Sequence, residues 1–189
     1  ATRAADEEAL AEKALDVLDG MLALGVTSCE CKSGYGLATE QELKQLRVTR
    51  TLQNRQPMTL VSTFMGAHAL PEEYRGNREG YIDLVIHDML PRVARENLAQ
   101  YCDVFCEQGV FSVEESRRIL LAAQALGLGA KIHADEVEAI GGSRLAGEIG
   151  AVSAEHLIAA DDAGIAALKA GGVIACLLPA TSLYLGKPF

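Results

Sequence analysis

Blocks of apolar and polar residues alternate along the chain, and the spacing of the apolar positions switches between two periods. Six short runs rich in Val, Ile, Leu and Cys predict buried strands at residues 26–32, 58–64, 103–106, 131–136, 151–155 and 173–178. Apolar residues at helical spacing predict helices at residues 5–24, 39–53, 78–98, 112–127, 142–149 and 161–170. Strands and helices therefore alternate through the whole sequence, and nothing indicates a hairpin.

Alternation of this kind predicts parallel strands joined by right-handed helical crossovers. Strands so rich in apolar residues are expected to be buried on both faces. An open doubly wound α/β sheet and a closed (β/α)₈ barrel both fit. Because no G-x-G-x-x-G follows the first strand, a dinucleotide-binding sheet is disfavoured. Six units are fewer than eight, so we interpret residues 1–189 as a single-domain, internal part of a larger TIM-type barrel, without the barrel ends.

Some helix boundaries carry local signals. Thr39 with Glu42, and Ser112 with Glu115, have the spacing of capping boxes at helix starts. The helix predicted at residues 78–98 contains a proline and is expected to be interrupted near it. The chain begins with a helix, and no closing helix is expected after its last strand.

Composition narrows the choice of partners. The net charge of −9 disfavours nucleic acid, and no apolar run approaches the ~20 residues of a membrane span. Five cysteines are an odd number without C-x₂-C pairs, so we expect free, buried thiols in a cytoplasmic protein. They are Cys29, Cys31, Cys102, Cys106 and Cys176. A small molecule is the expected partner.

Polar side chains stand at the ends of nearly every predicted strand: Tyr35, His68, Glu107, His133 and His156. Drawing chemistry from many strand ends around a ring is typical of barrel enzymes. The segment at residues 131–136, Lys-Ile-His-Ala-Asp-Glu, joins an imidazole to two carboxylates. Such a set suits a Zn²⁺ or Fe²⁺ site and also the removal of a proton from water.

Each of these residues also has a simpler interpretation. His133 and His156 could be strand-end histidines that only bond neighbouring loops, although adjacent strands would bring them within roughly 10–15 Å or less. His68 could be a surface loop residue, and Asp135 could cap a helix or point away from the site. His87 lies in mid-helix and is assigned no role. A phosphate cradle at residues 32–36 lacks the Walker spacing.

Several motifs occur together and in one order: Lys-Ser-Gly-Tyr-Gly-Leu at residues 32–37, Gly-Ala-His-Ala-Leu-Pro at 66–71, Val-Phe-Cys-Glu at 104–107, Lys-Ile-His-Ala-Asp-Glu at 131–136, and Ser-Ala-Glu-His-Leu at 153–157. In sequence and order they resemble imidazolonepropionase, and the resemblance covers essentially the whole chain. The loops at 33–36 and 67–71 are specific to that family and are not general features of the wider amidohydrolase superfamily.

The resemblance implies a metal-dependent (β/α)₈ hydrolase with a small β-domain built from the two chain ends. Its reaction would be hydrolysis of the cyclic amide C–N bond of 4-imidazolone-5-propanoate to N-formimino-L-glutamate in histidine degradation. One Zn²⁺ or Fe²⁺ would be held by a His-x-His pair after the first strand, a fifth-strand histidine and an eighth-strand aspartate. The full-length protein is expected to be a cytoplasmic homodimer.

Residue by residue, the resemblance implies that His133 is the fifth-strand metal ligand. Tyr35, His68 and Glu136 match substrate-binding positions, and His156 matches a histidine near the reacting carbonyl. We predict catalytic roles for Glu136, as proton shuttle, and for His156, as oxyanion donor.

The sequence also departs from the family pattern. It contains no His-x-His, and it lacks the eighth-strand aspartate, an arginine for the propanoate and the β-domain segments. A complete site needs at least three protein ligands, so these residues alone are expected to bind metal poorly and to be inactive. Two alternatives stay open: another cyclic amidohydrolase or deaminase of the same superfamily, and a non-catalytic barrel that binds a small anion through Tyr35 and the histidines.

Overall fold

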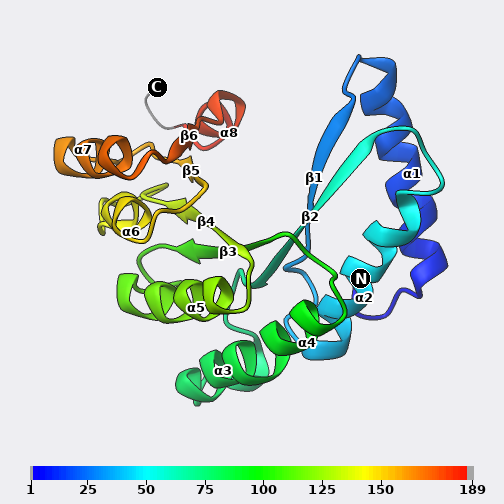
Figure 1. The fold of residues 1–189 in the computed structure, drawn as a ribbon, viewed down its shortest axis with the longest axis horizontal. Coiled ribbons are helices and arrows are strands. Elements are labelled where there is room, and N and C mark those ends of the chain that lie inside the picture. The colour runs from blue at the N-terminus through cyan, green and yellow to red at the C-terminus, as the bar shows by residue number, and fades with distance from the viewer. Residues whose placement is uncertain (1, 187–189) are drawn as a thin grey trace.

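The computed structural model describes residues 2–186, in which helices and strands alternate along the chain (Figure 1). The strands are β1 Ser28–Lys32, β2 Thr59–Ala67, β3 Tyr101–Cys106, β4 Gly129–Ala134, β5 Ser153–His156 and β6 Ile174–Cys176. The α-helices are α1 Glu7–Ala23, α2 Thr39–Leu52, α3 Arg78–Leu84, α4 Leu90–Arg95, α5 Val113–Ala125, α6 Gly142–Glu148, α7 Asp162–Gly171 and α8 Pro179–Tyr184. None of the described helices is long and apolar enough to cross a membrane.

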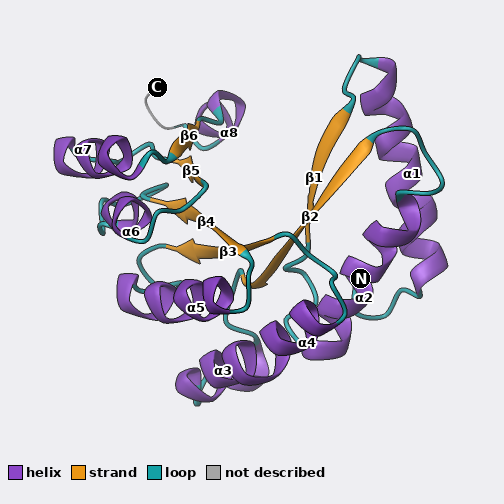
Figure 2. Ribbon diagram, viewed as in Figure 1, coloured by secondary structure: helices purple, strands orange, loops and turns teal. Residues whose placement is uncertain are grey.

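All six strands form one parallel sheet in the order of the sequence, from β1 to β6. The sheet is curved, and the helices follow the outside of its arc (Figure 2). β1 and β6 are its two edges in the described part of the chain. This arrangement is a partial (β/α)₈ barrel, as the alternation predicted, and not a doubly wound sheet, whose strand order would reverse.

The outer face of the sheet is apolar. On β4, Ala130, Ile132 and Ala134 are fully buried and pack in a core cluster beneath the helices. A smaller cluster forms between α1, α2 and β1, where Cys29 and Cys31 lie on the same face, as their spacing predicted. The side chains of alternate strand residues thus hold the helical layer in place.

The inner face is charged and on β4 only partly buried, so the prediction that the strands are buried on both faces was wrong for β4. Between the buried residues of β4 stand Lys131 and His133, which are only partly buried. Glu30 on β1, Asp103 on β3 and Glu155 on β5 lie on the same inner face. The alternation of apolar and charged positions was missed, because a strand with three apolar outer residues has a high apolar content and resembles a continuous apolar run.

The two predicted capping boxes differ in outcome. At the start of α5, Ser112 accepts from the backbone N–H of Glu115, and the Glu115 carboxylate accepts from the backbone N–H of Ser112, which confirms that box. At α2 the prediction was wrong, because the N-cap is Ala38 and makes no side-chain cap bond. Thr39 instead donates to Asp88 at 2.6 Å.

The long helix predicted at residues 78–98 is interrupted, as its proline suggested. A π-helical turn, Val85–Met89, separates α3 from α4. Pro91 lies in the first turn of α4 and cannot donate the N–H that a continuous helix requires. The wider π-helical turn removes the need for an N–H at Pro91, and the apolar face of the helix stays buried through Val85 and Met89.

Two smaller expectations were wrong near the end of the chain. A short helix, α8, follows β6, although no helix was expected there. Pro179 is the first residue of this helix, a position where its missing N–H costs nothing. Of the five cysteines, Cys102 and Cys106 are buried and Cys29 and Cys31 half-buried, but Cys176 on the edge strand is exposed.

Candidate functional site

The predicted site residues meet along one rim, where the carboxyl ends of the strands lie. Neighbouring ring centroids are 5.0 Å apart between Tyr35 and His68, and 5.2 Å apart between His133 and His156. Phe105, at the end of β3, joins the two pairs, with its ring 6.2 Å from His68 and 6.1 Å from His133. The structure therefore brings all four predicted rings into one row. Sequence reasoning missed Phe105, because an apolar strand residue carries no polar signal.

Glu136 joins this row from the loop after β4. Its Oε1 lies 3.5 Å from Nδ1 of His156, whose side chain is 8% exposed. That Nδ1 atom is buried and has no hydrogen-bond partner among the described residues. Burial lowers the pKa of His156, and the charge of Glu136 opposes this only in part. The neutral imidazole is thus favoured, beside a carboxylate that can exchange protons with a bound molecule.

The backbone is strained at the same rim. Asp135, His156 and Leu157 have φ values of 49°, 72° and 58°, in the left-handed region that non-glycine residues seldom occupy. Such strain costs on the order of 1–3 kcal/mol per residue and gathers at functional sites. Asp135 offsets it by accepting the backbone N–H groups of residues 140–143, which anchors the loop that carries Glu136. Asp135 therefore anchors the start of α6 and does not face the site.

The buried carboxylate of Asp103 orients the ring of His133. Its Nδ1 lies 3.0 Å from Oδ1 of Asp103, which is fully buried on β3, and Oδ2 of Asp103 accepts from Lys32 at 2.5 Å. With Nδ1 occupied, Nε2 is the atom left for a ligand, as in carboxylate–histidine–metal arrangements. Burial alone would lower the pKa of His133, but the hydrogen bond and charge of Asp103 outweigh burial and raise it.

Below His133, five charged groups form a network on the inner face, which we call the inner ion network: Glu30, Lys32, Asp103, Lys131 and Glu155. Lys131 lies 2.8 Å from Glu30 and 3.1 Å from Glu155, and Lys32 lies 3.2 Å from Glu30 and 3.8 Å from Glu155. Burial opposes both lysine charges, yet the facing carboxylates outweigh it and raise the pKa of each lysine. The two lysine side chains therefore stay charged, and they face three acidic side chains.

The metal-ligating potential of this region centres on His133. One ligand atom from each of Asp103, His133 and Glu155 lies within 4.8 Å of the others. Both oxygens of Asp103 are already engaged, however, and the ammonium group of Lys32 lies 2.5 Å from Asp103 and 3.8 Å from Glu155, where a cation shared by the two carboxylates would stand. The excess carboxylate of the network still favours a positive charge nearby. The residues present thus fit a metal above the network, on Nε2 of His133, better than one among the carboxylates.

Glu107 has a structural place, although it stands at a strand end. Its Oε2 accepts from the backbone N–H of Val137 at 2.8 Å, and its Oε1 accepts from that of Gln108. Its side chain is nearly buried. Glu107 therefore ties the loop after β4 to the end of β3 and does not offer a free carboxylate to a ligand.

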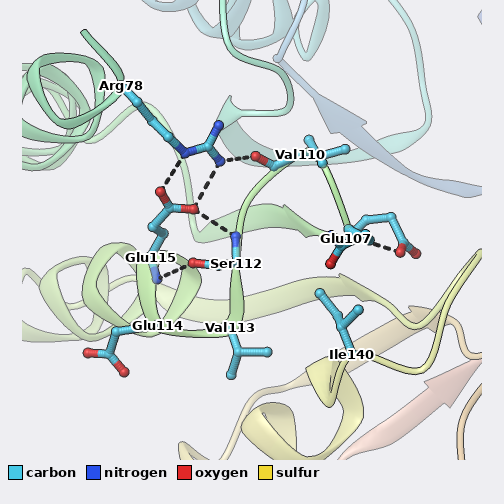
Figure 3. A pocket seen from close by; sticks show the side chains of 10 residues that line it. Arg78, Glu107, Val110, Ser112, Val113, Glu114, Glu115 and Ile140 are labelled. Atoms are coloured by element: carbon cyan, nitrogen blue, oxygen red, sulfur yellow. Dashed lines mark hydrogen bonds and ion pairs between the residues drawn. The ribbon is translucent and has the colours of Figure 1, made fainter.

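A hollow of about 540 Å³ lies beside the loop after β4, against the start of α5 (Figure 3). Arg78 forms a two-pronged ion pair with Glu115 there, donates to the carbonyl oxygen of Val110 and stacks 5.3 Å above the ring of Phe111. The charges of Arg78 and Glu115 thus satisfy each other, and this pair has a structural role at the start of α5. His87, the remaining histidine, is exposed on the helical surface, as predicted.

Comparison with known proteins extends these findings. No family model matches the sequence. The chain is 57% identical over 188 residues to an imidazolonepropionase of Clostridium tetani, covering 100% of this chain and 45% of that protein. It is 60% identical over 184 residues to an imidazolonepropionase of Fusobacterium nucleatum, covering 97% and 44%. The chain therefore spans less than half the length of the curated relatives that it matches.

Solved structures agree on the fold alone. The chain superposes on a 5-methylcytosine deaminase from Klebsiella pneumoniae with a TM-score of 0.66 at 15% identity, covering 91% of this chain and 43% of that one. It superposes on an N6-methyl-AMP deaminase from Arabidopsis thaliana with a TM-score of 0.67 at 12% identity, covering 94% and 54%.

Fold and rim together define the class: part of a (β/α)₈ barrel, with a row of polar rings at the carboxyl ends of its strands. Within that class, the chain belongs to the imidazolonepropionase family, to which its motifs pointed. The aligned region spans 188 residues and therefore contains every strand end that forms the rim.

Proposed function

We propose that the protein containing these residues hydrolyses the cyclic amide C–N bond of 4-imidazolone-5-propanoate and releases N-formimino-L-glutamate, a step of histidine degradation. The observation that carries the proposal is the meeting of His133, Glu136 and His156 at one rim. Their strands and loops are separate in the sequence, yet Glu136 lies 3.5 Å from His156, whose ring is 5.2 Å from that of His133. Family identity supplies the substrate class.

One divalent metal, Zn²⁺ or Fe²⁺, fits this proposal, with His133 as its ligand within this sequence. When bound, such an ion lowers the pKa of water and polarises a carbonyl group. Asp103 would hold the His133 ring in the tautomer that presents Nε2. The remaining ligands lie outside these 189 residues, since the sequence contains no His-x-His pair.

The residues of the rim divide the remaining work. Glu136 takes a proton from the attacking water and returns it to the ring nitrogen as the C–N bond breaks. His156, neutral because burial lowers its pKa, donates a hydrogen bond to the carbonyl oxygen as negative charge develops there. Tyr35 and His68 contact the substrate and orient it, so that their contribution is positioning.

The domain organisation and setting follow from the same proposal. We propose that residues 1–189 are the middle of one larger barrel, in a cytoplasmic, homodimeric protein whose partner is a small molecule. β1 and β6 would then pair with strands contributed by the rest of the protein. Ile174 on β6 is 64% exposed, which suits a strand that awaits a neighbour.

Expression of residues 1–189 alone tests this organisation. Two parallel edges without partners invite association, so we expect a poorly soluble or polydisperse product by size-exclusion chromatography with light scattering. The complete protein under the same conditions is the control. A monodisperse monomer that melts cooperatively would show that the chain is a self-sufficient domain and would contradict the barrel-segment proposal.

The activity is tested on the complete protein after metal analysis. Turnover is measured with 4-imidazolone-5-propanoate, and in parallel with other cyclic amides and with amino-substituted heterocycles of the kind that deaminases use. We expect turnover of the first and at least a hundredfold lower kcat/KM for the others, as when polar groups of a site lose their partners. Faster deamination would indicate a different reaction of the same barrel. Binding of small anions without any turnover would indicate a non-catalytic barrel.

A further inference from the structure

The loop between β1 and α2, residues 33–37, carries Tyr35 and is held by a carboxylate that sequence reasoning assigned elsewhere. Glu42 lies in the first turn of α2 and is fully buried. Its Oε2 accepts from the backbone N–H of Gly34, and its Oε1 accepts from those of Gly36 and Leu37, each at 2.7 Å. Glu42 therefore grips the loop on both sides of Tyr35.

The grip is unusual in its chemistry. Among the described residues, every donor to Glu42 is uncharged, including the side-chain amide of Gln45 at 3.4 Å. A buried carboxylate without a cation is stable only where several oriented dipoles compensate its charge. Hydrogen bonds to a charged group are also stronger than neutral ones. Three backbone donors on one carboxylate thus fix the loop far more firmly than a turn of its own would.

The loop also requires its glycines. Gly34 has a φ of +113°, and a Cβ there would lie 3.0 Å from the carbonyl oxygen of Met65. A Cβ on Gly36 would come within 2.7 Å of Gln41 in α2. The loop is therefore pressed against both β2 and α2, while the side chain between the two glycines, Tyr35, is 68% exposed at the rim.

The same loop fixes a second rim residue. Nδ1 of His68 lies 2.9 Å from the carbonyl oxygen of Gly34, so this nitrogen carries a hydrogen and Nε2 is left for a ligand. The Tyr35 and His68 rings meet edge to face at 73°. A shift of Gly34 would therefore move both rings together.

We infer that Glu42 is a positioning residue: it holds the loop at residues 33–37 so that Tyr35 and His68 present their polar atoms to the substrate. This inference rests on the proposed function for its substrate. It goes further in naming the group that sets the geometry of the substrate-binding half of the rim. Glu42 does not itself touch the substrate.

A double-mutant cycle in the complete protein tests the inference through activity. Glu42→Gln replaces one acceptor with an N–H₂ group that faces a backbone donor, and we expect KM for 4-imidazolone-5-propanoate to rise about tenfold with kcat changed less than about threefold. Because Glu42 acts in part through Tyr35, Glu42→Gln should raise KM by a clearly smaller factor in a Tyr35→Phe background than in the unmodified protein. Effects that multiply, or a loss confined to kcat, would overturn the inference.

Hydrogen exchange tests the grip without any turnover, so failure of the proposed reaction leaves this inference decidable. In the unmodified complete protein, the amides of Gly34, Gly36 and Leu37 should exchange at least about a hundredfold more slowly than in an unstructured peptide. Glu42→Gln should speed the exchange of Gly34 about tenfold or more. Glu40→Gln, which removes the same charge from the same turn, is the control and should leave it unchanged. Unprotected amides in the unmodified protein would refute the grip even if the variant does not fold.

Discussion

The outer face of the curved sheet serves stability and the inner face serves chemistry, and β4 shows both within a single strand. Ile132 faces the helices and is fully buried in the apolar core. His133, the next residue, faces inward, bonds to Asp103 and reaches the rim. Successive side chains of a strand point to opposite faces, so neighbours in sequence can have unrelated roles. Substitutions at these two positions should therefore differ in whether activity or stability is the main loss.

The largest expected effect is on the inner face. His133→Ala in the complete protein should lose bound metal and activity together, because the ring supplies a ligand nitrogen that alanine cannot replace. The metal-free variant should also lose some stability, because Oδ1 of the fully buried Asp103 loses its partner, so turnover is expressed per folded molecule. Metal analysis, turnover and thermal unfolding are measured on the same preparation. Full metal content with normal turnover would end the assignment of His133 as a ligand.

Glu136→Gln should come next. The substitution keeps the shape of the side chain and removes its basicity, so kcat should fall about 10²–10⁴-fold, the range for a lost general acid–base group. Metal content should stay near normal, because Glu136, in the loop after β4, lies beside His156 and is assigned to proton transfer and not to metal binding. Retained kcat with a raised KM would mean that Glu136 only holds the substrate. Lost metal would make it a ligand.

On the outer face, Ile132→Ala should act on stability alone. Removing most of a fully buried side chain from the core typically costs about 2–5 kcal/mol of unfolding free energy. Denaturant unfolding of the complete protein measures the loss, and kcat per folded molecule should stay close to that of the unmodified protein. If instead kcat falls while stability holds, the separation of the two faces is wrong.

The smallest effect concerns the ion pair beside α5. The hydrogen bond from Arg78 lowers the pKa of Glu115 from its ordinary 4.5 to about 2. A lowered folded-state pKa gives stability that is present above pH 4.5 and is lost as pH falls toward 2. Because the pair is partly open to water, we expect only about 1 kcal/mol.

Glu115→Gln isolates this term, since glutamine keeps the capping box. The unfolding free energy of the variant should fall less steeply between pH 4.5 and 2 than that of the unmodified protein. Glu114→Gln is the matched control, with the neighbouring carboxylate exposed on the same turn. Parallel curves for the Glu115→Gln variant and the unmodified protein would show that the pair contributes nothing measurable.

The sequence was sufficient for the order of strands and for the rim. His133 and His156 were found because parallel strands place their carboxyl ends at one edge, a rule that needs no long-range information. The inner ion network was not predicted, since Lys32 pairs with Asp103 across 71 positions and Lys131 pairs with Glu30 across 101. A local sequence pattern contains no information about an ion-pair partner so far along the chain.

Glu42 shows a different limit. A glutamate three residues after Thr39 fits a capping box, and the same spacing also lets the side chain reach back to the loop before the helix. The local sequence pattern cannot distinguish a capping box from a bond to the preceding loop, because the outcome depends on how closely the loop packs against β2. At α5, where no strand competes for the carboxylate, the capping box formed as predicted.

The charged inner face has a consequence for how such a barrel is made. During synthesis the earlier strands emerge first, and a partly built barrel exposes its future interior to water. A lining of valine and leucine would then attract other chains. Here paired lysines and carboxylates line the concave side, so that each charge lies against an opposite one and the face stays polar. If the rest of the barrel follows as we propose, the inner ion network thus keeps the unfinished interior from attracting other chains, and β1 and β6 are the parts that invite association.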